Sequence, residues 1–348
     1  MKKNIKAARC FLTKALMFGL VLTVCAAAAE AKGRKFGLFV GINEYSGMIP
    51  PLGGCVNDAK NMKTTLTAKY GFKAADTTLL TDAQATRDGI INKIKAYEKL
   101  AGAGDLFVFH YSGHGSLFPD AQSEEQDETE MIYYEQTYPG GEVEVVYPRD
   151  KYDATLVPVD ADETTSGKPW KNMILDDELY ALFSGFTKKG ARVVFISDSC
   201  FSGSIARNAK NKFPERFVPL HRVFGAKNFD EIKFRKPAKS TTAVEPPKLQ
   251  GLYLTLTAAN ANETALDGGE EGVVRMGLFT GNLVKALNAK GAAQMTYTQL
   301  MTNVSRKVSD FAKNKMAHNQ TPQLDASFGD PKTVIFTIPP AKPTGGKK

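Results

Sequence analysis

A histidine and a cysteine, each set among small residues, are the side chains of this chain with the clearest potential for chemistry. His114 lies in a Tyr-Ser-Gly-His-Gly segment that ends at Gly115, and Cys200 lies in an Asp-Ser-Cys-Phe-Ser-Gly segment that begins at Asp198. An imidazole can take the proton of a thiol, and the thiolate can then attack a carbonyl carbon. The backbone N–H groups of Gly115 and Cys200 are the expected donors to the resulting oxyanion. These residues therefore predict nucleophilic acyl transfer.

The elements that must position this pair are strands of a parallel sheet. Apolar runs rich in β-branched and aromatic residues, 106–109 and 193–196, directly precede the two segments, and such runs are typical of buried strands. Further runs alternate with helical patterns, which predicts a three-layer α/β/α sandwich around a mostly parallel sheet of about six strands, with ligands bound at the carboxyl ends of the strands. The expected strands span residues 35–42, 77–80, 106–111, 154–159, 191–197, 251–258 and 333–338, and the expected helices 55–70, 87–100, 176–186, 278–288 and 297–311.

Residues 1–31 are expected to be a secretory signal peptide rather than part of the fold. A basic start is followed by an apolar stretch too short for a comfortable membrane span and then by a run of small residues, which is the order that such signals show. Cleavage is expected after Ala29 or Ala31. The alternative is a lipoprotein signal at Cys25, although the valine before it is larger than such sites usually accept. The expected location is the periplasm or the outside of a bacterial cell, with no membrane contact after signal removal.

The charge and the cysteine count exclude other classes of partner and site. The net charge is +8, and removal of residues 1–31 lowers it to +4 because five basic residues and one acidic residue leave with them. This mild charge, with no Lys/Arg stripe interleaved with aromatic residues, predicts no nucleic-acid partner. Of four cysteines only Cys55 and Cys200 remain, which excludes a disulfide framework. A redox pair of these two is disfavoured because they lack a Cys-x-x-Cys spacing.

Residues 32–338 are expected to form one catalytic domain that two irregular segments interrupt. Residues 116–153 are an acidic insertion, expected to be a loop or a small hairpin near the active-site edge. Residues 205–250 are expected to be an exposed linker, since residues 201–250 carry eleven basic and four acidic residues without a sustained period. Residues 339–348 are expected to be a disordered tail.

Several ordered segments resemble the caspase-like cysteine peptidases, in their metacaspase and bacterial caspase-homologue branch. The Ser-Gly-His-Gly and Asp-x-Cys-x-Ser-Gly segments match that branch, whereas the Gln-Ala-Cys-x-Gly signature of animal caspases is absent. The resemblance extends from about Lys35 to about Ile338. It is also carried by residues 37–45, 52–59, 157–160, 175–179 and 277–280.

The resemblance implies a Cys–His dyad, in which Cys200 is the nucleophile and His114 the general base. It also implies that Asp58, Ser112 and Asp198 line a pocket for arginine or lysine. A carboxylate pair in such a pocket can hold a guanidinium bidentately. For Asp58 the residues alone leave an alternative, which is the N-cap of the first helix.

A calcium site is a further implication of the resemblance. Asp160, Asp176 and Asp177 match the acidic set that binds activating calcium in some metacaspases, and carboxylates suit this ion. A further acid is expected seven residues after the nucleophile, where this chain has Arg207. The alternative is that Asp176 and Asp177 are helix-start residues favoured by the helix dipole. The chemistry of the dyad itself requires no cofactor.

The sequence thus predicts a secreted cysteine endopeptidase that cleaves peptide or protein substrates after Arg or Lys. The basic segment after the nucleophile also predicts self-processing between Ile205 and Gln250, for example after Arg235, Lys236 or Lys239. The alternative is a catalytically silent binding or scaffold protein with the same fold. The intact dyad counts against this alternative.

Overall fold

The apolar runs of the sequence form a central six-stranded sheet in the computed structural model of the chain. The strand order is β11-β10-β9-β3-β1-β2, and all neighbours pair in parallel except β10 and β11, which are antiparallel. A parallel sheet of this kind needs helices on both faces to bury it. The strands are β1 (Lys35–Gly41), β2 (Thr77–Thr81), β3 (Leu106–Ser112), β9 (Arg192–Asp198), β10 (Tyr253–Thr257) and β11 (Gln323–Phe328).

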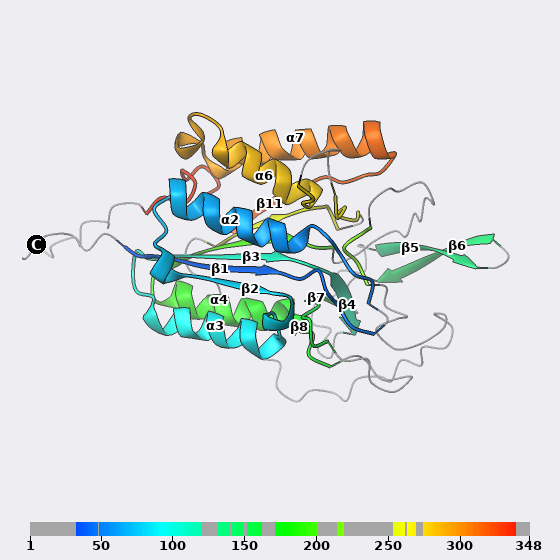
Figure 1. The fold of residues 1–348 in the computed structure, drawn as a ribbon, viewed down its shortest axis with the longest axis horizontal. Helices are drawn as coiled ribbons and strands as arrows, with labels where there is room; N and C mark the ends of the chain where they lie inside the picture. The colour runs from blue at the N-terminus through cyan, green and yellow to red at the C-terminus, as the bar shows by residue number, and fades with distance from the viewer. Residues whose placement is uncertain are drawn as a thin grey trace, which may run out of the picture. The chain divides into compact units, whose positions relative to one another are not determined.

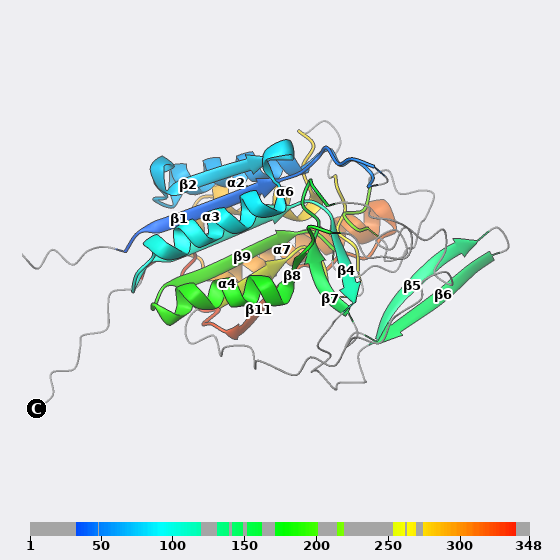
Figure 2. The same ribbon diagram turned by 90° about the horizontal axis from the view of Figure 1, so that it is seen from below.

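Helices supply this cover in two layers. α2, α6 and α7 lie on one face of the sheet (Figure 1), and α3 and α4 lie on the other, as the view from below also shows (Figure 2). The predicted three-layer α/β/α sandwich with a mostly parallel six-stranded sheet is therefore confirmed. Among the described residues, no helix is at once long and apolar enough to cross a bilayer. The helices are α2 (Cys55–Lys69), α3 (Arg87–Leu100), α4 (Asp176–Lys188), α6 (Leu278–Asn288) and α7 (Tyr297–Met316).

The described part of the chain comprises residues 33–47, 49–119, 131–138, 141–148, 152–161, 171–200, 214–218, 253–261, 263–268 and 274–338. The expected signal peptide, its lipoprotein alternative and the expected tail lie outside these residues. Arg207 and the example processing positions Arg235, Lys236 and Lys239 also lie outside them. Residues 214–218 are the described part of the expected linker.

The two faces of the sheet bury separate apolar clusters. Toward α3 and α4, Phe107, Phe109 and Phe186 are fully buried, and the rings of Phe107 and Phe186 stack with 4.5 Å between centroids. Val108 and Val194 belong to the cluster on the other face. Successive side chains of a strand point to opposite faces, so a strand covered on both faces is apolar at nearly every position. This is why the sequence shows continuous apolar runs here rather than alternation.

Helix boundaries follow local capping signals. The side chain of Thr86 accepts the backbone N–H of Gly89 at 3.0 Å and so caps α3. Thr296 and Gln299 form a capping box at the start of α7. Caps of this kind satisfy N–H groups that the helix itself leaves unpaired, and each stabilises a helix by about 1 kcal/mol. The predicted helices over 87–100 and 278–288 match α3 and α6.

The predicted strand over 333–338 is wrong. Phe336 has φ of +50°, a left-handed conformation that interrupts an extended chain. Its backbone N–H donates to the hydroxyl of Tyr297 at 3.0 Å, so this segment packs onto the start of α7 instead of entering the sheet. The last strand of the sheet is β11, which is antiparallel to β10.

The predicted strand over 154–159 does not join the central sheet either. β7 (Tyr152–Leu156) pairs antiparallel with β4 (Gly115–Pro119) and with β8 (Ile174–Leu175) in a small separate sheet. The strand β4 begins directly after His114, so the chain leaves the central sheet there and pairs locally. The expected insertion contains the hairpin of β5 (Met131–Tyr138) and β6 (Gly141–Pro148).

Candidate active site

The segments that carry His114 and Cys200 leave the central sheet side by side, at the carboxyl ends of its strands. β3 and β9 pair in parallel with Ser112 opposite Asp198, so His114 and Cys200 each follow two residues beyond the last paired position. A Cβ at Gly115 would overlap the carbonyl oxygen of Cys200, so only glycine allows the two loops to approach this closely. The order of parallel strands therefore brings the predicted dyad to one place.

His114 is buried, and a backbone carbonyl holds its ring. Nε2 lies 2.8 Å from the carbonyl oxygen of Pro50. Because a carbonyl can only accept, Nε2 carries a hydrogen in this hydrogen bond, which leaves Nδ1 as the ring nitrogen that could take a proton. The ring also packs against that of Tyr45, with 4.9 Å between centroids. This orienting group has no signal in the sequence, because a backbone carbonyl leaves no side-chain signature.

Cys200 is buried in surroundings that keep its thiol protonated. Its Sγ accepts the backbone N–H of Ala265 at 2.7 Å. Burial raises the pKa of the thiol, against smaller opposing effects of the Ala265 N–H and the Arg216 guanidinium. In this state Cys200 is therefore a thiol, and it would have to pass its proton to a base before it could act as a nucleophile.

The two expected oxyanion donors converge on one carbonyl oxygen. The backbone N–H groups of Gly115 and Cys200 both donate to the carbonyl oxygen of Arg216, at 3.0 and 3.2 Å. Arg216 belongs to the segment that the sequence predicted as an exposed linker. That prediction is wrong for this part of it, since Arg216, Phe217 and Val218 are buried. The reason is that the chain passes through the active site and forms backbone hydrogen bonds there.

The side chain of Arg216 fills a pocket lined by carboxylates. Its Nη2 donates to Asp58 Oδ2 at 2.7 Å, and its Nη1 donates to Ser112 Oγ at 2.8 Å. Nη1 also forms an ion pair with Asp198 Oδ1 at 2.9 Å. The structure thus gathers the three residues predicted to bind a basic side chain around a guanidinium. Asp58 is not the N-cap, because that position is Gly54 and no side chain makes a capping bond there.

A fourth pocket residue, Asp267, was not predicted. Its Oδ1 accepts from Nη2 of Arg216 at 2.9 Å, and its Oδ2 pairs with Arg275 at 2.9 Å. The backbone N–H groups of Gly53 and Gly54 also donate to this carboxylate, at 2.7 and 2.9 Å. Asp267 lies in an aperiodic segment, and nothing in the neighbouring sequence distinguishes it from an ordinary loop aspartate. Only the folded chain brings it to the pocket.

The charges of the pocket depend on one another. Burial raises the pKa of Asp58 to about 7, although Arg216 opposes this. Burial acts in the same direction on Asp267, but there Arg216 and the Gly53 N–H outweigh it and hold the pKa of Asp267 below its usual value. Burial alone would lower the pKa of Arg216, but the nearby carboxylates, Asp198 foremost, raise it well above the usual value. A cation is therefore what this pocket stabilises.

The residues predicted for calcium are not gathered in the described structure. Asp160 Oδ1 accepts the backbone N–H of Arg87 at the start of α3, at 2.7 Å. Asp176 and Asp177 are the first residues of α4 and are exposed, as the helix-start alternative predicted. Among the residues described, no group of three or more His, Cys, Asp or Glu could hold a metal ion. As placed, these residues do not form a calcium site, and calcium activation stays a prediction.

The thiol redox alternative finds no support. Cys55 and Cys200 are both free cysteines. Cys55 Sγ lies 3.9 Å from Asp267 Oδ1, against the carboxylate pocket. Burial raises the pKa of Cys55 well above its usual value, as it raises that of Cys200, so neither cysteine is held as the thiolate that disulfide exchange requires.

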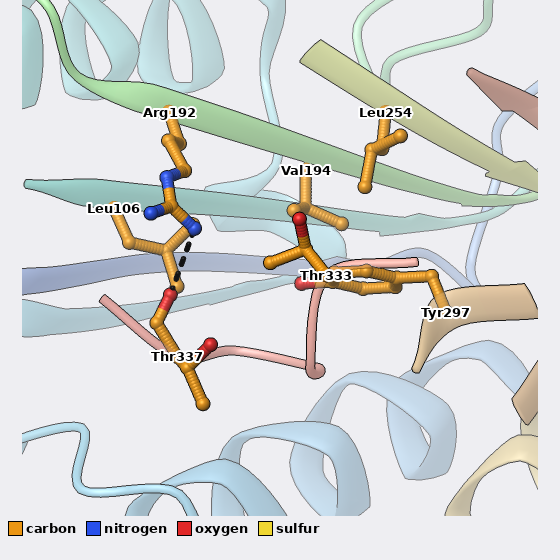
Figure 3. Close-up of a pocket in the computed structure, with 7 residues that line it drawn as sticks. All are labelled: Leu106, Arg192, Val194, Leu254, Tyr297, Thr333 and Thr337. Atoms are coloured by element: carbon orange, nitrogen blue, oxygen red, sulfur yellow. Dashed lines mark hydrogen bonds between the residues drawn. The ribbon is translucent and has the colours of Figure 1, made fainter. Parts of the chain in front are cut away.

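A small recess in the structure lies away from this site. It is lined by Leu106 and Arg192, the first residues of β3 and β9, and the Arg192 guanidinium donates to the carbonyl of Thr337 at 3.1 Å (Figure 3). The recess therefore lies at the amino ends of the strands, whereas His114 and Cys200 follow their carboxyl ends. At the carboxyl edge the carboxylate pocket is filled by an arginine side chain of the chain itself.

Known proteins resemble this chain in sequence and in fold. Residues 34–332 match the family described as the caspase domain. Metacaspase-1A of Aspergillus terreus is 34% identical over 182 residues, which cover 51% of this chain and 38% of that protein. Metacaspase-1B of Aspergillus oryzae is 32% identical over 337 residues, which cover 88% of this chain and 71% of that protein. The crystal structure of a Geobacter sulfurreducens protein matches with a TM-score of 0.56 at 25% identity and covers 88% of this chain and 99% of that chain. The chain spans well under half the length of the Metacaspase-1A relatives that it matches.

Proposed function

This chain belongs to the caspase-domain family, and we propose that it is a cysteine endopeptidase that cleaves peptide and protein substrates after Arg or Lys. The observation that carries the proposal is the placement of Arg216. Its guanidinium contacts the carboxylates of Asp58 and Asp198, while its carbonyl oxygen accepts two backbone N–H groups. A substrate with arginine before the scissile bond would bind in this way. A lysine ammonium would meet the same carboxylates as a point charge.

In the proposed reaction His114 Nδ1 takes the thiol proton, and Cys200 Sγ attacks the carbonyl carbon of the bound basic residue. The N–H groups of Gly115 and Cys200 stabilise the oxyanion. The carbonyl of Pro50 keeps the ring in place and favours the imidazolium that forms. The proton then passes from His114 to the leaving amine, and water hydrolyses the thioester to restore the thiol. These steps use no metal and no cofactor.

A peptide series that varies only the residue before the cut tests this proposal. Arg and Lys peptides should be cleaved, a Gln peptide slowly and an Asp peptide not at all. An acidic side chain would enter the pocket unpaired and face Asp58, Asp198 and Asp267, which costs several kcal/mol, or about a thousandfold in rate. Faster cleavage after Asp than after Arg would contradict the pocket. The silent-scaffold alternative predicts that no peptide is cleaved and that an Arg-directed alkylating probe leaves Cys200 unlabelled.

The preference for arginine should weaken in mild acid. With an arginine in the pocket the pKa of Asp58 is raised to about 7, and a carboxylate loses its charge as the pH falls through its pKa. The ratio of kcat/KM for an Arg peptide to that for a matched Gln peptide should therefore decrease from about pH 8 to about pH 6. Any effect of His114 protonation applies equally to the cleavage of both peptides, so it cancels in the ratio. In Asp58→Asn the ratio should be flat over this range, and a slope equal to that of wild type would contradict the assignment.

Gly277 forms a wall of the pocket. A Cβ at this position would lie 2.6 Å from Nη1 and 2.7 Å from Cζ of Arg216. Overlap of this kind costs about 1–3 kcal/mol, so Gly277→Ala should lower kcat/KM for Arg peptides by about tenfold or more. Gly281→Ala, in the first turn of α6, whose N-cap is Gly277, is the matched control, because its new Cβ lies 3.6 Å from the nearest side-chain atom around it. Equal losses in the two variants would show an effect on the helix rather than on the pocket.

The proposal includes two further properties expected from the sequence, which are self-processing within residues 205–250 and export to the periplasm or the cell exterior. Cell fractionation and amino-terminal sequencing of the protein produced from the full chain test the export. A mature start after Ala29 or Ala31 in the exported fraction supports it. A cytoplasmic protein that keeps residues 1–31 contradicts it.

A further inference from the structure

We infer that the bond between Arg216 and Phe217 is the one that this protein cleaves in itself. The inference rests on the proposed function, because it requires Cys200 to act as a peptidase nucleophile. It goes further by naming the first substrate of the site, which is a segment of the same chain. Three groups of contacts support it: those of the Arg216 side chain, those of the backbone before the bond and those of the backbone after the bond.

The side chain of Arg216 is bound as the side chain of a substrate would be. It is fully buried, and its two terminal nitrogens contact Asp58, Ser112 and Asp267 at 2.7 to 2.9 Å. These contacts use the residues that make the pocket selective for a cation. No other basic residue can enter the pocket while Arg216 fills it.

The backbone before the bond forms the hydrogen bonds of an added strand. The N–H of Arg216 donates to the carbonyl of Ala265 at 3.0 Å, and the N–H of Asp267 donates to the carbonyl of Pro214 at 2.8 Å. Residues 214–216 and 265–267 therefore run antiparallel, with a bridge between them. Extended peptides commonly bind to exposed backbone in this manner, with main-chain hydrogen bonds for affinity and a side-chain pocket for specificity.

The backbone after the bond is held as well. The N–H of Val218 donates to the carbonyl of Gly115 at 2.9 Å. The Arg216 carbonyl lies between the backbone hydrogen bonds before the bond and the one after it. This carbonyl accepts the N–H groups of Gly115 and Cys200 at 3.0 and 3.2 Å. A purely structural arginine would need only a buried partner for its guanidinium. It would not need its carbonyl at the two N–H groups that flank the thiol.

The chemistry of the cut balances with water as the co-reactant. Cys200 Sγ leaves the Ala265 N–H, passes its proton to His114 and attacks the carbonyl carbon of Arg216. The bond to the nitrogen of Phe217 breaks, and this nitrogen takes the proton from His114 and becomes a new amino terminus. Water hydrolyses the thioester, which makes Arg216 a carboxyl terminus and restores the thiol. Departure of that terminus opens the pocket to other substrates, so the uncut chain is latent.

The test follows fragmentation of the full-length protein at several protein concentrations, with amino-terminal sequencing of the fragments. Wild type should yield a fragment that begins at Phe217, at a rate independent of concentration because the substrate is held in the same chain. Arg235→Gln is the matched control, a basic residue of the same linker, and should be cut like wild type. Arg216→Lys should be cut at the same bond more slowly. Arg216→Gln should be cut there at least about tenfold more slowly, and Cys200→Ala should stay whole.

Hydrolysis of an Arg peptide by wild type is measured in parallel, so that failure of this inference can be told apart from failure of the proposed function. If wild type hydrolyses the peptide but stays whole, or begins its fragment elsewhere, this inference is overturned and the proposed function stands. The inference also fails if Arg216→Gln is cut at the wild-type rate or if the wild-type rate rises with protein concentration. Thermal unfolding shows whether Arg216→Gln is folded. If it is not, the inference is judged by the cleavage rate of Arg216→Lys and by whether the wild-type fragment begins at Phe217. A wild type that cleaves no Arg peptide overturns the proposed function and this inference with it.

Discussion

Replacement of Cys200 with Ala is expected to abolish peptidase activity, with a fall in kcat/KM for Arg peptides of about a thousandfold or more. The reason is that the acyl-enzyme cannot form without Sγ, whereas the oxyanion donors and the pocket remain. The substitution leaves the backbone N–H of Ala265 without its acceptor at 2.7 Å. A lost partner for a buried donor costs about 1–3 kcal/mol, so the variant should fold with a modestly lower unfolding midpoint. Kinetics and thermal unfolding measure the two effects.

A thiol-alkylating probe supplies the control for this variant. Both cysteines of the folded domain are buried, and burial raises the pKa of Cys55 as it does that of Cys200. His114 and Cys200 each follow two residues beyond the paired Ser112 and Asp198, so a probe with an Arg-directed group should label wild type once, at Cys200, and Cys200→Ala not at all. Full turnover by Cys200→Ala, or labelling of Cys55 in its place, would show that the nucleophile has been assigned to the wrong residue.

The parts of the fold and the site that the sequence predicted are those with local signals. Thr86 marks the start of α3, and apolar periodicity carries the helix to its end. A continuous apolar run that ends at Gly or Asp marks β3 and β9, and neighbouring parallel strands deliver their carboxyl-terminal loops to one edge of the sheet. The joint position of His114 and Cys200 is a consequence of that rule. The convergence of Asp58 and Asp198 was implied by the resemblance, since on its residues alone Asp58 had the pattern of a helix cap.

The parts that were missed depend on contacts between distant segments. β11 is an edge strand that pairs on one side only, so it needs no continuous apolar run, and the more apolar residues 333–338 give the stronger strand signal. Asp267 meets Gly53 and Gly54 only because the first helix and a late loop meet at the sheet edge. Arg216 lies in a basic segment whose composition indicates exposure, and only the carboxylates of the folded domain make its burial favourable. No periodicity within either segment reports such a pairing.

Neutralisation of Asp198 is expected to give the second large loss, about 30-fold or more in kcat/KM for Arg peptides. Asp198 Oδ1 lies 2.9 Å from Nη1 of Arg216, and both side chains are fully buried. Removal of one charge from a buried pair costs about 2–5 kcal/mol, because the partner is left undercompensated in a medium that screens it poorly. The variant Asp198→Asn keeps an oxygen to accept the backbone N–H of Thr280, which Oδ2 accepts at 2.9 Å, so the start of α6 should be preserved.

The matched control for this loss is Asp88→Asn, on α3, where the carboxylate is 86% exposed and should be dispensable for cleavage. The decisive comparison is between an Arg peptide and the same peptide with Gln, because only the first carries the charge that Asp198 contacts. Asp198→Asn should reduce cleavage of the Arg peptide and leave cleavage of the Gln peptide nearly unchanged. If both fall by the same factor, Asp198 supports the neighbouring nucleophile rather than the pocket. The selection of a basic side chain would then rest on Asp58 and Asp267, which contact the other terminal nitrogen of the guanidinium.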